Sequence, residues 1–270
     1  MRLAINRTVA PQLDLEAFLG LARTAGVGAI EVRNDVEGQE FANGVAAREL
    51  RQRLRDAGLA FASINALQRF NDWTAERERE ATALIRYAKE LGAPGIVMCP
   101  VIATDHGWSD GELERKLRQA LRAMAPIYRD HGVFGYVEPL GMVGSTLRHQ
   151  APAVAAIADV DGGAAFALCY DTFQFYRSRD QQLFADQIGL VHVSGISRTD
   201  LPREQLTEPD RGLIDGNDIV DNLAQLQALK TAGYDGFVSI EPFDPKVQRD
   251  SALVASLAAS IRYIEAGLHG

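Results

Sequence analysis

Short apolar runs alternate with longer amphipathic stretches along the whole chain of 270 residues. The apolar runs, rich in Val, Ile, Leu, Phe or Ala, are typical of buried parallel strands, and the stretches between them are typical of crossover helices. Eight such units can be counted. The predicted strands span residues 3–6, 29–33, 61–65, 95–99, 134–138, 166–171, 190–194 and 237–241.

Each predicted strand precedes a plausible helix, and in the clearest of these helices apolar residues recur at three- and four-residue spacing. The clearest helices span residues 15–24, 46–56, 75–91, 110–131, 219–231 and 251–266, and the weakest is the sixth, around residues 181–187. A glycine stands between helix and strand at five joints, as expected where a helix ends. These glycines are Gly26, Gly58, Gly92, Gly132 and Gly233.

Eight strand-helix units predict an α/β fold, the (β/α)8 TIM barrel, which typically needs about 250 residues. An open doubly wound sheet shows the same alternation, but no GxGxxG pattern follows the first predicted strand. No Pro- or Ser-rich linker interrupts the alternation. We therefore expect a single domain over residues 1–270, with its active site at the carboxyl ends of the strands.

Composition and charge restrict the partners and the compartment of this barrel. The formal net charge is −8, and the 28 Lys and Arg residues are scattered along the helices instead of forming a stripe, so we expect no nucleic-acid partner. No apolar stretch reaches the roughly 20 residues that span a bilayer, and the first residues lack a secretory signal. We expect a cytoplasmic protein without a membrane role. Cys99 and Cys169 lie in strand-like runs without CxxC spacing, which predicts a reduced, buried pair.

Four polar side chains end, or lie within, the consecutive predicted strands five to eight. They are Glu138 in Tyr-Val-Glu-Pro, Asp171 in Leu-Cys-Tyr-Asp-Thr, His192 in Leu-Val-His-Val and Glu241 in Ser-Ile-Glu-Pro. Each alone has an ordinary explanation, since an acid at a strand end often caps the next helix and a strand His often makes a core hydrogen bond. Three converging carboxylates would repel one another, and a divalent cation relieves that cost. The set predicts a metal centre, for Mn²⁺ first and for Mg²⁺, Co²⁺ or Zn²⁺ as alternatives.

Other residues near the predicted strand ends carry weaker signals. Arg211, in the long loop after strand seven, is either a solvated cation or a donor to a substrate oxygen. Asn65 ends strand three, where a turn or helix cap competes with a substrate contact, and Trp73 either walls a pocket or packs its loop against the barrel. Glu31 and Arg33 should point to the same side of strand two, which favours an internal ion pair over a substrate contact.

Several motifs resemble those of the xylose isomerase-like TIM barrels, and within them the bacterial inosose (2-keto-myo-inositol) isomerases of inositol catabolism. The resemblance runs nearly from end to end of the chain. It rests on Ile64-Asn65-Ala66-Leu67 with Phe70-Asn71, Glu138-Pro139-Leu140-Gly141, Asp171-Thr172-Phe173-Gln174-Phe175, Val191-His192-Val193, Asp210-Arg211 and Val238-Ser239-Ile240-Glu241-Pro242-Phe243. In such enzymes the matching Glu, Asp, His and Glu bind a divalent metal, so the resemblance gives that role to the four residues at the strand ends.

Two positions depart from the pattern of this family. Gln174 stands where relatives usually have a substrate-binding His, and Gln donates a hydrogen bond to a hydroxyl but does not titrate near neutrality. The loop after Arg211 reads Gly-Leu-Ile-Asp-Gly in place of an aromatic-proline-glycine pattern. We expect substrate contacts from Arg211, Gln174, Asn65 and Trp73, in a pocket whose wall differs from that of the relatives.

The resemblance implies an enzyme that moves a carbonyl between adjacent carbons of a cyclic polyol ketone through an enediolate. Glu138 and Glu241, facing each other across the ring of strands, are the predicted acid–base pair, and the stereochemistry of the substrate decides which of the two acts first. A ketose 3-epimerase, or another sugar isomerase of the family, is the first alternative, and a non-catalytic sugar-binding barrel is the second. Relatives in the family often associate, so the resemblance also implies a homo-oligomer. The small-molecule partner that it implies is a polyol or ketose substrate.

Overall fold

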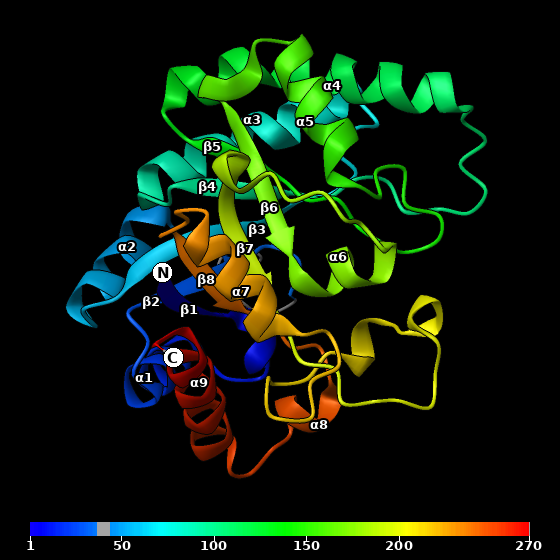
Figure 1. Cartoon of the computed structure of the whole chain (residues 1–270). Coiled ribbons are helices and arrows are strands. Elements are labelled where there is room, and N and C mark those ends of the chain that lie inside the picture. The colour runs from blue at the N-terminus through cyan, green and yellow to red at the C-terminus, as the bar shows by residue number, and fades with distance from the viewer. Residues whose placement is uncertain (37–43, 270) are drawn as a thin grey trace.

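The computed structural model describes residues 1–36 and 44–269, which form a closed barrel of parallel strands in the order β1 to β8 (Figure 1). Pairing of β8 with β1 closes the ring. The predicted TIM barrel is confirmed. The strands are β1 (Arg2–Asn6), β2 (Ala29–Arg33), β3 (Ala60–Leu67), β4 (Gly95–Met98), β5 (Phe134–Val137), β6 (Phe166–Asp171), β7 (Ile188–Val193) and β8 (Phe237–Ile240).

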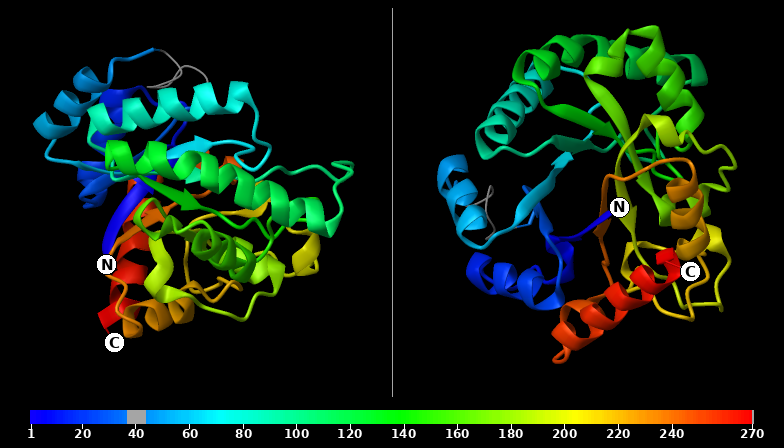
Figure 2. Two further views of the ribbon diagram at one scale, coloured as in Figure 1. Left: turned by 90° about the horizontal axis from the view of Figure 1, so that it is seen from above. Right: turned by 60° about the vertical axis from the view of Figure 1, so that its left-hand side comes forward.

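Helices cover the outside of the barrel, as both views of Figure 2 show. All five predicted joint glycines have a positive φ, between 64° and 93°, which residues with a Cβ rarely adopt. Every helix of the described residues is too short or too polar to cross a bilayer. The helices are α1 (Leu15–Ala25), α2 (Ala47–Asp56), α3 (Ala75–Leu91), α4 (Asp110–His131), α5 (Gln150–Asp159), α6 (Thr172–Ser178), α7 (Asn222–Thr231), α8 (Pro245–Gln248) and α9 (Leu253–His269).

The sixth crossover helix does not lie where the sequence pattern placed it. Helix α6 follows β6 directly, whereas residues 181–187 contain only the short 3-10 helix Ala185–Gln187. The reason is a cap: the Asp171 carboxylate accepts a hydrogen bond from the Gln174 backbone N–H and so starts the helix at the strand end. The other predicted helices and the eight strands are confirmed, with bounds that differ by at most three residues.

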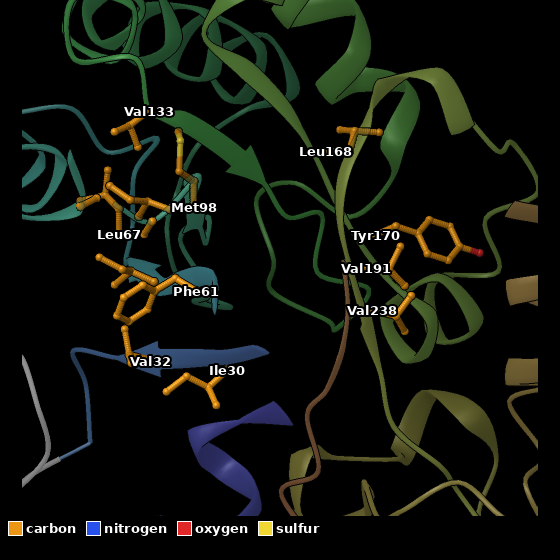
Figure 3. Packing of buried hydrophobic residues seen from close by; sticks show 14 of the residues in the cluster. Ile30, Val32, Phe61, Leu67, Met98, Val133, Leu168, Tyr170, Val191 and Val238 are labelled. Atoms are coloured by element: carbon orange, nitrogen blue, oxygen red, sulfur yellow. The ribbon is translucent and has the colours of Figure 1, made fainter. Parts of the chain in front are cut away.

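The strands have two different faces, and this difference brings polar residues to the inside of the barrel. On β2, Ile30 and Val32 are buried in the apolar layer between the strands and the helices, a part of which Figure 3 shows. The alternate residues Glu31 and Arg33 contact side chains of β7 and of the segment after β8, across the barrel interior. Alternation along a strand therefore decides which side chains reach the interior.

A second apolar cluster fills the barrel interior with small side chains around one tyrosine. A Cβ added at Gly95 would lie 2.3 Å from the Tyr136 ring, and one added at Gly189 would lie 2.5 Å from it, so the ring occupies the space that these glycines leave. Both cysteines are reduced and buried in this cluster, as predicted. The cluster consists of Ala4, Ala29, Ala62, Ala66, Val97, Cys99, Tyr136, Leu140, Cys169 and Leu190.

Cations of α2 and α3 gather along one groove on the outside of the barrel. The groove has a volume of about 680 Å³, and Glu90 is the one acid in its lining. The expectation that basic residues are scattered is therefore wrong for this surface, because the fold sets two basic helix faces side by side. The cations that line the groove, which we call the basic groove, are Arg48, Arg51, Arg55, Arg86 and Lys89.

Candidate metal centre

Four side chains converge at the carboxyl ends of β5 to β8. The ligand atoms of Glu138, Asp171, His192 and Glu241 all lie within 4.8 Å of one another, and all four residues are buried. Strands that are neighbours in a parallel barrel end at the same rim, which is why residues so distant in the sequence meet here. The four residues that the sequence singled out are thus brought together in one cluster.

The backbone holds three of these side chains at the strand ends. The Glu138 and Glu241 amides directly follow β5 and β8 and still donate to the neighbouring strands, to the Met98 carbonyl at 3.1 Å and the Val193 carbonyl at 2.9 Å. Asp171 ends β6 and also caps α6. The capping explanation therefore holds for Asp171 alongside its place in the cluster, because a carboxylate has two oxygens.

His192 lies within β7 and has acidic side chains at both ring nitrogens. Its Nδ1 is 3.1 Å from Glu138 Oε1 and 3.4 Å from Glu241 Oε2, so this nitrogen faces the other candidate ligands. Its Nε2 is 3.1 Å from each carboxylate oxygen of Glu31. The ring thus offers one nitrogen to the cluster and the other to a carboxylate of β2.

Burial and charge shift the protonation of this cluster. Burial alone would lower the pKa of His192, but the neighbouring Cys169, Glu241 and Glu31 raise it well above its usual value. Burial raises the pKa of Glu241 to about 7 against the opposing charges of His192 and Arg211. Burial also acts to raise the pKa of Glu31, but the charge of His192 and the hydrogen bonds to Glu31 lower it to about 2. A metal that binds here must displace protons.

Arg211 is buried beside the candidate ligands and contacts two of them. Its Nη2 donates to Asp171 Oδ2 at 2.7 Å and to Glu241 Oε2 at 2.9 Å. Its Nε donates to Ser194 Oγ and its Nη1 to Glu208 Oε2. Burial alone would lower the pKa of the guanidinium, but these carboxylates raise it well above its usual value, so the group stays charged. The alternative of a solvated loop cation is wrong for this residue.

A small pocket of about 150 Å³ adjoins the cluster. Its lining includes Glu138 and Glu241 but neither Asp171 nor His192, so the two glutamates are the candidate ligands that face the pocket. This division follows from the fold, because both glutamates stand just beyond their strands while His192 lies within one. Three of the predicted substrate-binding residues also line the pocket, namely Asn65, Gln174 and Arg211.

The predicted substrate-binding residues differ in how they relate to this pocket. Asn65 Nδ2 donates to Glu241 Oε1 at 3.0 Å, and Gln174 Nε2 donates to Glu208 Oε1 at 3.0 Å. Trp73 is not among the lining residues; it is half-buried and packs against the main apolar core. The structure therefore supports the packing interpretation of Trp73 over a substrate contact.

Sequence reasoning missed how the charged residues of β2 enter the site. The expected ion pair between Glu31 and Arg33 is wrong, since Arg33 pairs at 2.8 Å with Asp35 and with Glu241 Oε1, and Glu31 contacts His192. The signal was present, because two charges on the inner face of one strand both need partners. Their partners come from strands that the sequence does not pair with β2.

The donor set of the cluster fits a divalent metal. Three carboxylates and one imidazole are mostly hard donors, and the buried carboxylates need a cation to offset their mutual repulsion. Cys169 Sγ lies 3.5 Å from His192 Nδ1 and completes a second candidate group with Glu138 and His192. Burial raises the pKa of the Cys169 thiol well above its usual value, which disfavours the thiolate that this second group would need.

Together, the closed barrel and the buried cluster at the ends of its strands define a TIM-barrel protein with a candidate metal centre. The particular family follows from comparison with known proteins. The chain belongs to the xylose isomerase-like TIM barrel family, whose model matches residues 19–265.

Two curated relatives match almost the whole chain. An inosose isomerase of Halalkalibacterium halodurans is 26% identical over 98% of this chain and 96% of its own length. An inosose isomerase of Bacillus velezensis is 24% identical over 93% of this chain and 92% of its own length. The similarity thus extends over the barrel as a whole and includes the strands that carry the four candidate ligands.

Solved structures share the same fold. A xylose isomerase domain containing protein from Salmonella typhimurium LT2 matches with a TM-score of 0.88 and 28% identity, over 100% of this chain and 97% of its own. The IolI protein, solved with a binding zinc atom, matches with a TM-score of 0.87 and 22% identity, over 99% and 98%. An L-ribulose 3-epimerase matches with a TM-score of 0.75 and 19% identity, over 99% and 94%.

Proposed function

We propose that this protein is a divalent-metal-dependent isomerase that moves a carbonyl between adjacent carbons of a cyclic polyol ketone. The observation that carries the proposal is that Glu138 and Glu241 belong to the candidate ligand set and also line the pocket. Two carboxylates facing one small site are the acid and base that the reaction needs. The inosose isomerases that match the whole chain support 2-keto-myo-inositol as the substrate.

The pocket suits a small polyhydroxylated ligand. Its volume of about 150 Å³ is below the roughly 300 Å³ at which sites for drug-sized ligands begin. Asn65, Gln174 and Arg211 offer hydrogen-bonding groups along its wall, and Phe243 offers an apolar face. A single sugar or polyol ring matches both the size and this mixed lining.

The metal would be held by Glu138, Asp171, His192 and Glu241, with Mn²⁺ as the first choice and Mg²⁺, Co²⁺ or Zn²⁺ as alternatives. When bound, such an ion supplies a Lewis acid for the ketone oxygen and the neighbouring hydroxyl. The IolI protein, which shares this fold and was solved with a binding zinc atom, supports a metal in this protein.

The two glutamates differ in how many donors they receive, which suggests a division of labour. Glu138 Oε2 contacts the Cys99 thiol at 3.4 Å and no other described donor. Glu241 Oε1 accepts three hydrogen bonds, from Asn6, Arg33 and Asn65. We assign removal of the carbon-bound proton to Glu138, because its outer oxygen is the less occupied one.

The isomerisation then follows from proton transfers alone. The C–H proton passes to Glu138, and the electron pair left behind forms an enediolate with the neighbouring carbonyl. The oxygen of the former hydroxyl gives up its proton to the old carbonyl oxygen and becomes the new carbonyl, while a proton returns to the carbon that carried the old one. We assign the return of that proton to Glu241, which lines the pocket, and the stabilisation of negative charge to the guanidinium of Arg211, which contacts Glu241.

Proton NMR tests this function directly. The protein, loaded with Mn²⁺ that is removed before acquisition, is incubated with 2-keto-myo-inositol in D₂O. We expect formation of the neighbouring keto-inositol, with deuterium from the solvent at the carbon that receives the proton. A protein that binds the ligand but exchanges none of its carbon-bound hydrogen would be a sugar-binding barrel instead.

A ketose 3-epimerase is the second candidate, because a solved L-ribulose 3-epimerase shares this fold. Gln174 replaces the substrate-binding His expected from the family resemblance, so the pocket wall differs at a position that touches substrate in such relatives. An epimerase would use the same two glutamates on opposite faces of one carbon. No change in 2-keto-myo-inositol together with an inverted hydroxyl in a ketohexose would establish this alternative.

The Glu138→Gln variant tests the assigned base. We expect turnover to fall by at least about 100-fold, because Gln keeps the size of the side chain but cannot accept the proton. Metal content is measured on the same sample, since loss of a ligand would also reduce turnover. Near-full activity in a variant that retains its metal would remove Glu138 from the acid/base role.

A further inference from the structure

We propose that Glu31 is a positioning residue for the metal centre: it holds the His192 proton on Nε2 and so directs Nδ1 toward the metal. The inference rests on the proposed metal centre and goes beyond it, because Glu31 is outside the ligand set and outside the pocket lining. Glu31 acts through His192 and through Asn6, each of which it contacts.

Glu31 is fully buried and held by four donors from four other strands. Asn6 Nδ2 of β1 donates at 2.7 Å and Ser239 Oγ of β8 at 2.8 Å, while Ser63 of β3 donates a further short hydrogen bond. The fourth partner is His192 Nε2 of β7, 3.1 Å from both carboxylate oxygens. The carboxylate is thus fixed in position before any metal enters.

The placement of Glu31 follows from strand register. Asn6 of β1 and Ser63 of β3 are the register partners of Glu31 on its two sides, and Ser239 is the register partner of His192. Register partners on neighbouring parallel strands point to the same side of the sheet. These five residues therefore form one polar layer inside the barrel, at the level of the imidazole.

This layer determines which nitrogen of His192 can bind a cation. A neutral imidazole carries one N–H and one lone pair. Glu31 offers only acceptor oxygens to Nε2, since its three other partners already donate to it. In the neutral ring that could bind a cation, the N–H therefore belongs on Nε2 and the lone pair on Nδ1, the nitrogen that lies 3.1 Å from Glu138 and 3.4 Å from Glu241.

Glu31 also reaches a second candidate ligand through Asn6. Asn6 Nδ2 donates to Glu31 Oε2 at 2.7 Å and to Glu241 Oε1 at 3.1 Å. The amide cannot turn over, because its Oδ1 accepts from the Thr8 backbone N–H at 3.0 Å. One carboxylate on β2 is therefore connected to the ligands on β7 and after β8.

Fold stability alone does not account for this arrangement. A carboxylate with no exposed surface costs free energy that its partners only partly return, and apolar side chains of similar volume are often at least as stabilising. Four polar partners on four strands are arranged around Glu31; one of them, His192, is itself a candidate ligand, and another, Asn6, donates to the candidate ligand Glu241. Orienting the candidate metal ligands is the role that explains why Glu31 is buried among these four partners.

The test compares metal affinity and the histidine tautomer in wild type and Glu31→Gln. Affinity for Zn²⁺ is measured by competition with a fluorescent chelator, and the His192 ring is observed by ¹⁵N NMR in the zinc-loaded protein, with His192→Gln to assign its signals. We expect Glu31→Gln to weaken binding by about 10- to 100-fold, as is typical when the outer partner of a metal-binding His is lost. In wild type we expect the proton on Nε2.

Controls separate this inference from the proposed function. Glu114→Gln removes an exposed carboxylate on α4 and should leave the affinity unchanged, which controls for net charge. A wild-type protein that binds no divalent metal would overturn the proposed function. If the wild-type protein binds Zn²⁺ and Glu31→Gln binds it with the same affinity, only the role of Glu31 is overturned. Because the tautomer is read in wild type, a proton on Nδ1 would overturn that role even where Glu31→Gln does not fold.

Discussion

At the scale of single residues, Asp171 shows how one side chain can serve several purposes. Its Oδ1 accepts from the Gln174 backbone and caps α6, while its Oδ2 accepts from Arg211. The same carboxylate lies within the candidate ligand set. Burial raises its pKa despite the opposing charge of Arg211, so a cation in the cluster would favour the ionised form. Capping and metal binding are therefore compatible functions of this residue.

Metal affinity should depend on pH. The pKa of Glu241 is raised to about 7 and that of His192 well above its usual value, so without a cation His192 holds its proton at neutrality and Glu241 gains one as the pH falls through about 7. Binding must release those protons, and we therefore expect the apparent affinity to fall as the pH falls from 8 to 6, by up to about tenfold per unit for each proton released. Chelator competition at several pH values, corrected for the chelator's own protonation, measures this. An affinity independent of pH would contradict the shifted pKa values.

At the scale of elements, packing inside the barrel depends on glycines in the strands. Tyr136 of β5 lies between β4 and β7, against Gly95 and Gly189. Neighbouring positions of the same interior cluster carry Ala or Val on β1 to β4, which leaves the ring enough space. Side chains of a barrel interior interdigitate at high density, so an added methyl has nowhere to go. The two glycines are therefore part of the packing of this barrel.

Gly95→Ala should lower the free energy of unfolding by about 1–3 kcal/mol, the usual cost of overpacking a core. A Cβ there would lie 2.3 Å from the Tyr136 ring and 2.9 Å from the Phe134 carbonyl oxygen. Gly20→Ala in α1 is the matched control, because no atom lies within 4 Å of its added Cβ and alanine favours a helix by up to about 1 kcal/mol. Urea unfolding measures both variants. Equal effects of the two substitutions would argue against the close contact with Tyr136.

At the scale of the whole molecule, the net charge is negative although one groove on the surface is lined mostly by cations. The formal net charge of −8 disfavours a polyanionic partner. The basic groove nevertheless concentrates cations with Glu90 as the one acid in its lining, and Arg48 pairs with that acid at 2.6 Å. Three expectations remain predictions: that no nucleic acid binds, that the protein forms a homo-oligomer and that it is cytoplasmic. The basic groove is the reason to test the first of them.

Duplex DNA should not bind measurably at physiological salt. We expect no saturable change in the fluorescence anisotropy of a short labelled duplex up to about 10 µM protein, because the net charge repels the phosphates and salt screens a local patch. Saturable binding would contradict this expectation. The double variant Arg51→Gln/Arg86→Gln would then show whether the DNA binds in the basic groove. Its matched control is Arg53→Gln/Arg118→Gln, because Arg53 and Arg118 lie outside the groove lining and are paired with acids. Loss of binding in the first variant but not in the second would make the groove the binding site.

The sequence by itself determined the barrel and the candidate ligands. Eight apolar runs, the joint glycines and the four polar residues at Glu138, Asp171, His192 and Glu241 are local signals, because hydrophobic periodicity and helix ends depend on near neighbours in the chain. Consecutive strands of a parallel barrel must end together at one rim, so the convergence of these four residues also followed from the predicted fold.

Only the tertiary structure decided which side chains became partners. Glu31 contacts His192 and Arg33 contacts Glu241, although the sequence suggested that the two residues of β2 pair with each other. Helix α6 starts at Asp171, and Trp73 packs against the core outside the pocket. The physical reason is that hydrogen bonds and ion pairs require contact within about 3 Å. Such contacts depend on barrel closure, strand register and side-chain reach, none of which a local pattern contains.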